Sequence, residues 1–363
     1  MMKIAIIGTR GIPNHYGGFE QFAEYVSVGL VKMGCEVSVY NSHNHPFQRA
    51  EYKGVKIIHC KDPEHKFGTI GQFIYDLNCI RDSRKRKYDI ILQLGYTSSS
   101  IWHWLLPKKS IVTTNMDGIE WKRTKFSSKV QRFLKYAEKL AVNNSDYLIA
   151  DSVGIQEHIK SSYNKDSIYI PYGAFLKNET DDNDLSEYNL IKHEYNMLVA
   201  RLEPENSIEV ILDGCVLSKT NIPFLVVGKI DTKFGQHLVE KYKKNKNILF
   251  AGGIYDQEKL SNLRACSNIY FHGHTVGGTN PSLLEAMGDG CFIIANDNIF
   301  NKSILSKDAL YFENVEQVAK IIMDNNRNDF GDFISNNQEK IRTIYSWETI
   351  IQKYHSHFLN ICK

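Results

Sequence analysis

Short apolar runs alternate with amphipathic stretches along the whole chain. The first run, at 3–8, is an unbroken β-type sequence, typical of a strand buried on both faces of a parallel sheet. Apolar residues at positions 22, 26, 30 and 31 then share one face of a helix. The same alternation predicts further strands at 36–40, 55–59, 89–94, 111–114, 147–150 and 168–171. Helices are predicted between them at 68–84, 128–143 and 155–161.

A second alternation follows a polar stretch at 175–194, which lacks periodicity and predicts a linker. Strands are predicted beyond it at 195–200, 224–227, 248–250, 268–272 and 291–295, and helices at 207–217, 233–244, 258–264, 315–325 and 347–360. At 363 residues the chain is too long for one average core. The pattern predicts two doubly wound, Rossmann-like α/β domains, 1–174 and 195–345, that bind ligands beyond the carboxyl ends of their strands.

Composition narrows the class of protein. The apolar share of 42% is that of a soluble globular protein, and no run of about 18 apolar residues could span a bilayer. The first residues predict a strand rather than a signal peptide. Seven cysteines without a Cys-x-x-Cys pair favour reduced thiols in a cytoplasm over disulfides or zinc. The Asp-Asn-Asp sequence at 182–184 resembles a metal-binding Asp-x-Asp motif but lies in the predicted linker, so no metal site is expected.

Charge is divided unevenly between the two halves. Residues 1–172 carry a net charge of +8 and the remainder −5, which favours anionic material near the first half. A basic run at 81–87 follows a helical apolar face, and an apolar segment at 102–106 precedes Lys108 and Lys109. Either segment fits core packing with a solvated end, or contact with an anionic membrane surface. No basic–aromatic stripe of a nucleic-acid-binding protein is present.

The stretch 272–287 carries the clearest candidate chemistry. Asn280 suits a helix N-cap and Pro281 the first helical position. Gly277 and Gly278 allow the backbone to approach a ligand closely. A strand, a glycine turn and a capped helix together predict an anion site, although the same sequence also fits an ordinary connection between strand and helix.

The loop after the first predicted strand is also rich in glycine. Gly8, Gly11, Gly17 and Gly18 do not have the Gly-x-Gly-x-x-Gly spacing of dinucleotide-binding proteins. Such a long loop before the first helix suits a phosphate or a sugar better than a dehydrogenase pyrophosphate.

These motifs together resemble the retaining family 4 glycosyltransferases, whose GT-B fold has two Rossmann-like domains facing each other across a cleft. More narrowly, the chain is similar to a subgroup that includes bacterial rhamnosyltransferases of capsule and surface-polysaccharide assembly. The resemblance covers nearly the whole chain. It rests on the segments 8–13, 16–20, 117–123, 199–206 and 272–287. A final helix at 346–363 is expected, by the same resemblance, to cross back to the first domain.

The resemblance implies a nucleotide-sugar site in the second domain. Glu285 matches the second glutamate of the family's Glu-x7-Glu signature, which holds the ribose hydroxyls, while Gly277 replaces the first. Arg201 matches the arginine that clamps the diphosphate, and Asn206 replaces its lysine partner. Gly17 and Gly18 match the loop that lets the donor phosphate approach the first domain. Further donor contacts are expected at Lys229, Gly278, Thr279 and Asn280.

The reacting groups are expected in the first domain. Asp117 stands where many relatives have a histidine near the reacting sugar, and with Glu120 it forms an acidic pair after a predicted strand. Asp117 is expected to orient the acceptor hydroxyl or to accept its proton, although it could also cap a helix. Glu20, His272 and His274 are candidate sugar contacts, with structural roles as the alternative.

The resulting hypothesis is a metal-independent enzyme, without a cofactor, that transfers a sugar such as L-rhamnose from a nucleotide-diphosphate sugar with retention. Its expected acceptor is a saccharide, free or linked to polyprenyl diphosphate, at the cytoplasmic face of the cell membrane in surface-polysaccharide synthesis. Two alternatives stay open: a sugar-nucleotide epimerase of the same fold, and a non-catalytic sugar-nucleotide-binding relative, suggested by Gly277 and Asn206.

Overall fold

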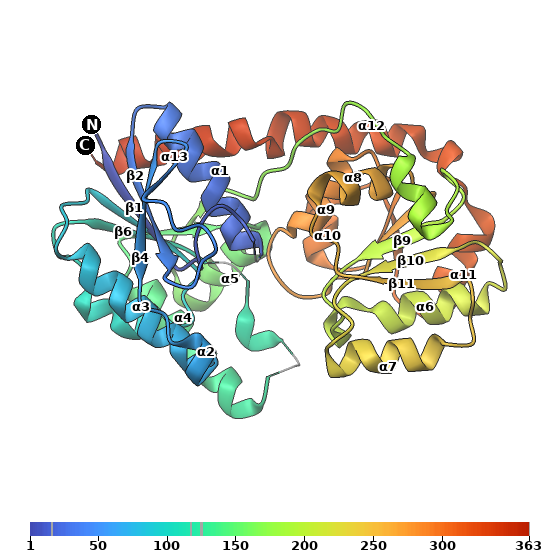
Figure 1. Ribbon diagram of the computed structural model, residues 1–363, viewed down its shortest axis with the longest axis horizontal. Helices are drawn as coiled ribbons and strands as arrows, with labels where there is room; N and C mark the ends of the chain where they lie inside the picture. Colours follow the sequence, from blue (N-terminus) through green and yellow to red (C-terminus); the bar gives the residue numbers. More distant parts are fainter. Residues whose placement is uncertain (16, 117, 124–125, 363) are drawn as a thin grey trace. The chain divides into compact units, whose positions relative to one another are not determined.

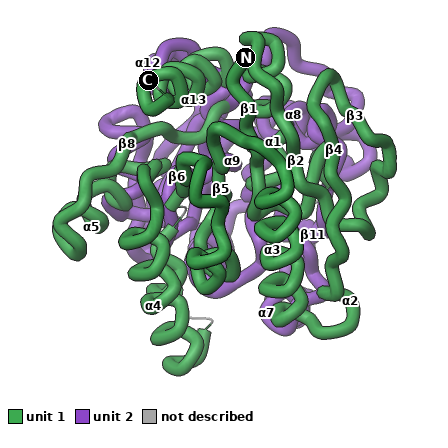
Figure 2. Tube along the Cα trace, turned by 90° about the vertical axis from the view of Figure 1, so that its left-hand side faces the viewer, with its two compact units in different colours: residues 1–173, 347–363 green, residues 174–346 purple. Residues whose placement is uncertain are grey.

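The computed structural model describes residues 1–363 except 16, 117, 124–125 and 363. The chain divides into two compact units (Figures 1 and 2). Unit 1 contains Met1–Gly173 and Trp347–Lys363, and unit 2 contains Ala174–Ser346. Both termini lie at the same end of unit 1 (Figure 1).

Unit 1 is built on an eight-stranded sheet with the order β3-β4-β2-β1-β5-β6-β7-β8, parallel except for β3 against β4. Its strands are β1 (Lys3–Ile7), β2 (Glu36–Ser42), β3 (Glu51–Tyr52), β4 (Val55–Cys60), β5 (Ile90–Leu94), β6 (Ile111–Asn115), β7 (Tyr147–Ala150) and β8 (Ile168–Tyr169). The central strands β1 and β5 are almost wholly apolar because both of their faces are covered. These strands occupy the predicted segments, which confirms the fold class for this half.

Helices cover both faces of this sheet. They are α1 (Gly18–Lys32), α2 (Glu64–Phe67), α3 (Thr69–Ser83), α4 (Ser128–Asn144), α5 (Val153–Tyr163), α13 (Trp347–Ile361) and the 3₁₀ helices η1 (Ser100–Leu105) and η2 (Glu120–Lys122). α3 packs through Tyr75, Cys79 and Ile80 on the side chains of β1, β2 and β5. α4 and α5 form a second apolar cluster with β7. The C-terminal helix α13 lies against α1, where Tyr354 and Trp347 contact Phe22.

Unit 2 has a six-stranded parallel sheet with the order β11-β10-β9-β12-β13-β14. Its strands are β9 (Asn196–Val199), β10 (Phe224–Val227), β11 (Ile248–Gly252), β12 (Ile269–His272), β13 (Ile293–Asn296) and β14 (Leu310–Phe312). Its helices are α6 (Ile208–Leu217), α7 (Lys233–Tyr242), α8 (Gln257–Ala265), α9 (Pro281–Gly288), α10 (Ile299–Leu305), α11 (Val315–Asp324) and α12 (Gly331–Lys340). The 3₁₀ helices η3 (Asn183–Tyr188), η4 (Pro204–Asn206) and η5 (Arg327–Phe330) and the π-helix η6 (Ile341–Tyr345) complete it. A second Rossmann-like sheet confirms the predicted two-domain α/β class.

The segment expected to act as a linker lies within unit 2. Leu185 of η3 is buried, and the Asp184 carboxylate accepts a hydrogen bond from Asn262 of α8 at 2.9 Å. The polar sequence therefore packs on the second unit although it lacks periodicity. None of the helices that the structure describes combines the length and apolar character that a bilayer crossing requires.

Candidate active site

The residues expected to hold the donor lie at the carboxyl edge of the unit 2 sheet, which we name the donor edge. Arg201 follows β9, Lys229 follows β10, and the glycine loop 273–280 follows β12. Since neighbouring parallel strands end at one edge, these groups converge there. Arg201 is exposed, and the structure shows no ion pair for its guanidinium among the residues described. Lys229 extends toward the Tyr255 ring, 5.8 Å from its centroid.

The helix start at the end of this loop is formed as predicted. The Asn280 side chain accepts a hydrogen bond from the Ser282 N–H at 2.9 Å, and Pro281 is the first helical residue. These observations confirm Asn280 as the N-cap. Thr279 is buried and Gly278 partly buried, so the loop follows the protein surface closely. The positive end of the helix dipole at this start suits a phosphate.

Asn206, His274 and Gly277 form one interlocked group. The Asn206 amide donates to the Arg201 carbonyl at 2.7 Å, and its Oδ1 lies 2.7 Å from His274 Nδ1. Gly277 has a φ of +139°, and a Cβ there would lie 2.9 Å from His274 Nε2. The imidazole thus takes the space that a side chain at 277 would need. We find Asn206 bridging the loops after β9 and β12, a role that the sequence did not predict.

Close packing fixes these two loops against each other. A Cβ on Gly273 would lie 2.0 Å from the Asn206 carbonyl oxygen, so only glycine fits there. The Thr275 hydroxyl donates to the Glu205 carbonyl at 2.7 Å. Asn298, which caps α10, donates to the His274 carbonyl at 2.9 Å. Hydrogen bonds therefore connect the loops that follow β9, β12 and β13, three neighbouring strands of the sheet, at the donor edge.

Glu285 is held in place by a buried arginine. Arg264 of α8 is 2% exposed; its Nη1 donates to Glu285 Oε2 at 2.8 Å and its Nε to Asp289 Oδ2 at 2.6 Å. Glu285 itself stays 20% exposed. A carboxylate has about four acceptor positions, so this ion pair leaves capacity for hydroxyl groups. Arg264 was assigned no role from the sequence, because its two partners lie more than twenty residues further along the chain.

His272, at the end of β12, is 4% exposed, and its Nε2 has no hydrogen-bond partner in the described part of the chain. Burial, with a smaller effect from nearby His274, lowers the pKa of His272 to about 3. The ring is therefore neutral at physiological pH. This burial favours a structural role over a sugar contact.

We expect His272 to make folding sensitive to acid. Its pKa in the unfolded chain is about 6.5, so below that pH the unfolded state takes up a proton that the folded state refuses until about pH 3. The free energy of unfolding should thus fall as pH decreases through this window, by at most about 1.4 kcal/mol per unit from this group. Urea unfolding between pH 7 and 4 checks this. The His272→Gln variant should show a shallower pH dependence, and an unchanged slope would contradict the prediction.

The loop after β1 places Gly17 and Gly18 at the start of α1. Gly17 occupies the N-cap position and Gly18 begins the helix, without a capping side chain. Glu20 is buried, and its Oε1 accepts from the Arg10 N–H at 2.8 Å and from the Thr9 hydroxyl at 3.2 Å. Glu20 therefore holds the first glycine loop, so its contacts support the structural alternative rather than a sugar contact.

The segment after β6 carries the expected reacting groups. Asp117 lies outside the described residues. Glu120 is partly buried in η2, and its Oε1 lies 2.9 Å from Arg123 Nη2. The Gly118 backbone has a φ of +69°, which turns the chain immediately after position 117. The helix near Trp121, which Asp117 was alternatively expected to cap, is the short 3₁₀ helix η2, and Ile119 occupies its N-cap position.

A polar pocket of about 270 Å³ lies at the carboxyl ends of β1, β2 and β4 in unit 1. Its walls carry charged, imidazole and amide groups: Arg10, His15, Ser42, Asn44, His45, Asp62, Glu64 and His65. A larger hollow of about 620 Å³ in unit 2, lined by Asn221 and Lys246, lies at the amino ends of β10 and β11, away from the donor edge. Among the described residues, no group of three or more His, Cys, Asp or Glu has the arrangement of a metal site.

Both halves of the chain match known protein families. Residues 182–329 match the glycosyl transferases group 1 family, and residues 1–175 match DUF1972, a domain of unknown function. The second unit is similar to the group 1 glycosyl transferases over most of its length. Its matched region contains the whole donor edge, from Arg201 to Glu285.

Individual relatives agree with this assignment. An uncharacterized glycosyltransferase of Methanocaldococcus jannaschii is 28% identical over 256 residues, which cover 64% of this chain and 63% of that protein. The sucrose-phosphate synthase of Thermosynechococcus elongatus has a TM-score of 0.80 at 19% identity, covering 99% of both chains. Anabaena HepE in complex with UDP and glucose has a TM-score of 0.76 at 14% identity, covering 99% of this chain and all of that one. These structural likenesses confirm the GT-B fold of the chain.

Proposed function

We propose that this protein is a glycosyltransferase that transfers a sugar, L-rhamnose in the narrow form of the proposal, from a nucleotide-diphosphate sugar to a saccharide, with retention of configuration. The observation that carries the proposal is the donor edge, where Arg201, Lys229, the capped start of α9 and Glu285 converge. A diphosphate suits the cations and the positive end of the α9 dipole. A carboxylate held by Arg264 suits the hydroxyls of a ribose. HepE, which shares the fold, binds UDP and glucose.

The donor edge also supplies what the reaction needs. As the bond to the diphosphate breaks, negative charge grows on the leaving oxygen, and a preorganised cation stabilises that charge. Arg201 is exposed and available for this role in solution. The dipole of α9 contributes only about 0.3–2 kcal/mol to stabilising this charge, so we assign the larger part of the stabilisation to Arg201. Asp117 and Glu120, on the segment after β6, are proposed to orient the acceptor hydroxyl and accept its proton.

Donor preference is proposed to depend on the Asn206–His274–Gly277 group. At the position where the resembled family has a glutamate, this chain has Gly277, and His274 Nε2 lies 2.9 Å from the place that a Cβ would take. Asn206 is the second departure from the family pattern, and its Oδ1 holds His274 Nδ1 at 2.7 Å. The two departures are thus parts of one arrangement. Replacing a carboxylate by an imidazole favours a sugar with fewer hydroxyls, such as a 6-deoxy sugar.

The acceptor is proposed to bind in unit 1. The 270 Å³ pocket at the ends of β1, β2 and β4 is small for a drug-sized ligand and suits a single sugar unit. Its carboxylates, amide and imidazoles are the groups that pair with sugar hydroxyls. Arg10, which lines it, is oriented by Glu64 through two hydrogen bonds at 2.8 and 3.2 Å.

A lipid-linked acceptor would bring the enzyme to the inner face of the cell membrane in surface-polysaccharide synthesis. Phe67, Ile70 and Trp104, on α2, α3 and η1, are large apolar side chains that are more than half exposed. The exposed Lys66 and Lys108 lie beside them in the sequence. This combination suits peripheral contact with anionic lipid, at about 1 kcal/mol per basic residue near the surface.

A ligand screen tests the proposed function. A nucleotide sugar at about 100 times its Kd should stabilise the protein by about 2.7 kcal/mol, measured as a thermal shift with UDP-, dTDP-, GDP- and ADP-sugars. We expect a response to one nucleotide class, strongest with dTDP-rhamnose, followed by nucleotide release when a saccharide acceptor is added. Sedimentation with anionic vesicles in the same preparation measures membrane contact. Isomerisation of the sugar without acceptor would instead indicate an epimerase, and no response to any nucleotide would overturn the proposal.

A further inference from the structure

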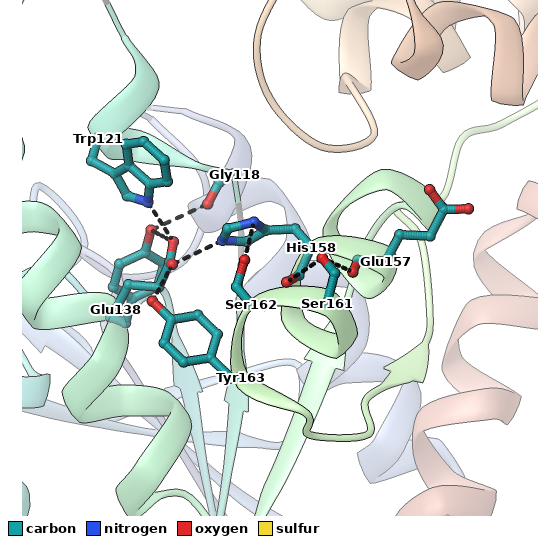
Figure 3. Close-up of polar contacts among 9 residues, drawn as sticks. Gly118, Trp121, Glu138, Glu157, His158, Ser161, Ser162 and Tyr163 are labelled. Carbon is teal, nitrogen blue, oxygen red and sulfur yellow. Dashed lines mark hydrogen bonds and ion pairs between the residues drawn. The ribbon is translucent and has the colours of Figure 1, made fainter.

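A buried carboxylate in unit 1 is surrounded by hydrogen-bond donors. Glu138, in the middle of α4, is only 2% exposed. Its oxygens accept from Trp121 Nε1 at 3.0 Å, His158 Nε2 at 2.9 Å and Tyr163 Oη at 2.6 Å (Figure 3). Tyr96 Oη approaches the same carboxylate at 3.3 Å. An unpaired carboxylate would be strongly unfavourable at such a site, so these donors explain why a glutamate is tolerated there.

The donors keep Glu138 ionised. Burial alone would raise the pKa of this carboxyl, but the hydrogen bonds from His158, Tyr163 and Trp121 lower the pKa below its usual range. Hydrogen bonds to an ionised acceptor are stronger than those between neutral groups. Glu138 is thus a fixed anion to which several side chains are held.

Two of these donors are connected with the segment that follows β6: Trp121 belongs to it, and Tyr96 contacts it. Trp121 lies in η2, and its ring also has Lys135 of α4 above it, 4.8 Å from the centroid. Tyr96 Oη, besides approaching Glu138, lies 3.2 Å from the Gly118 carbonyl oxygen. The carboxylate therefore holds this segment directly at Trp121, while the single hydroxyl proton of Tyr96 is shared between Glu138 and the Gly118 carbonyl of the segment. The other two donors, His158 and Tyr163, come from α5 (Figure 3). The His158 ring also packs on the segment, 6.1 Å from the Trp121 ring between centroids.

We propose that Glu138 is a positioning residue, which fixes the segment 118–121 and with it the reacting group proposed at Glu120. The inference rests on the proposed function for its catalytic meaning. A short 3₁₀ turn has few backbone hydrogen bonds of its own, so its position depends on such side-chain contacts. A displacement of about 1 Å at a reacting group can lower a rate about a hundredfold. Support from two packed helices gives the segment the rigidity that a catalytic site requires.

Two matched tyrosine variants test this role. Tyr96→Phe and Tyr163→Phe each remove one hydroxyl that contacts Glu138, but only Tyr96 also contacts the Gly118 carbonyl. We expect Tyr96→Phe to lower the turnover number for sugar transfer about tenfold while the KM for the donor stays within twofold. We expect Tyr163→Phe, which loses the shorter hydrogen bond, to leave turnover within twofold and to lower only the melting temperature.

Hydrogen exchange makes the test independent of activity. Amides at 118–123 should exchange at least fivefold faster in Tyr96→Phe than in the wild type, and at the wild-type rate in Tyr163→Phe. If Tyr163→Phe lowers turnover or protection of 118–123 as much as Tyr96→Phe, or if Tyr96→Phe changes neither, Glu138 has only a structural role and the proposal is overturned. A wild-type protein without transfer activity would contradict the proposed function instead, while the exchange data would still decide the positioning role.

Discussion

Replacing Arg264 by alanine is expected to lower the free energy of unfolding by about 3–5 kcal/mol, the usual effect of removing one partner of a buried ion pair. Arg264 lies between α8 and α9, and its guanidinium pairs with both Glu285 and Asp289. Burial by itself would lower its pKa, but these two carboxylates hold the pKa of Arg264 above its ordinary value. Alanine would leave Asp289, which is only 7% exposed, without its cation.

Urea unfolding of the purified protein measures this loss. A matched control is Arg342→Ala, because Arg342 also pairs with a carboxylate, that of Glu339, but both side chains are more than half exposed. The control should change the free energy of unfolding by no more than about 1 kcal/mol. The thermal shift caused by the preferred nucleotide sugar should also shrink in Arg264→Ala, since Glu285 loses the group that fixes it. A loss of stability in Arg264→Ala no larger than that of Arg342→Ala would contradict the prediction.

The sheets were predictable because their sequence signal is local. The run at 3–8 is apolar at nearly every position, and only a strand covered on both faces accommodates such a run in a short segment. Asn280 and Pro281 were predictable as a helix start for the same reason, since capping depends on neighbouring residues. The fold class and the position of the donor edge follow from these local patterns.

The supporting contacts of the site could not be predicted in this way. Arg264, Glu285 and Asp289 meet only after α8 and α9 pack together, and no local pattern marks that meeting. Asn206 was expected to contact the donor, but its amide connects two loops that are 68 residues apart in sequence.

The sequence around Glu138 indicates a buried carboxylate. Leu134, Ala137 and Ala141 mark the buried face of α4, and Glu138 lies on that same face. An acidic residue in a buried stripe needs donors from elsewhere in the fold. Glu20 gives a similar signal at the start of α1, next to the buried Phe22. In both cases the residue type and its place in the helical pattern indicate a buried carboxylate, although the partners appear only in the folded structure.

Arg201→Ala is expected to lower the turnover number for transfer by about 10²–10³, the loss typical of removing one group that stabilises developing negative charge. The side chain is exposed, so folding stability should change by no more than about 0.5 kcal/mol. Initial rates of nucleotide release, with donor and acceptor saturating, measure the turnover number, and thermal unfolding measures stability. Arg201→Lys, which keeps the charge but loses the planar fork, should retain an intermediate rate. A rise in the KM for the donor with an unchanged turnover number would show that Arg201 binds the ground state and transition state equally, which would contradict its assigned role.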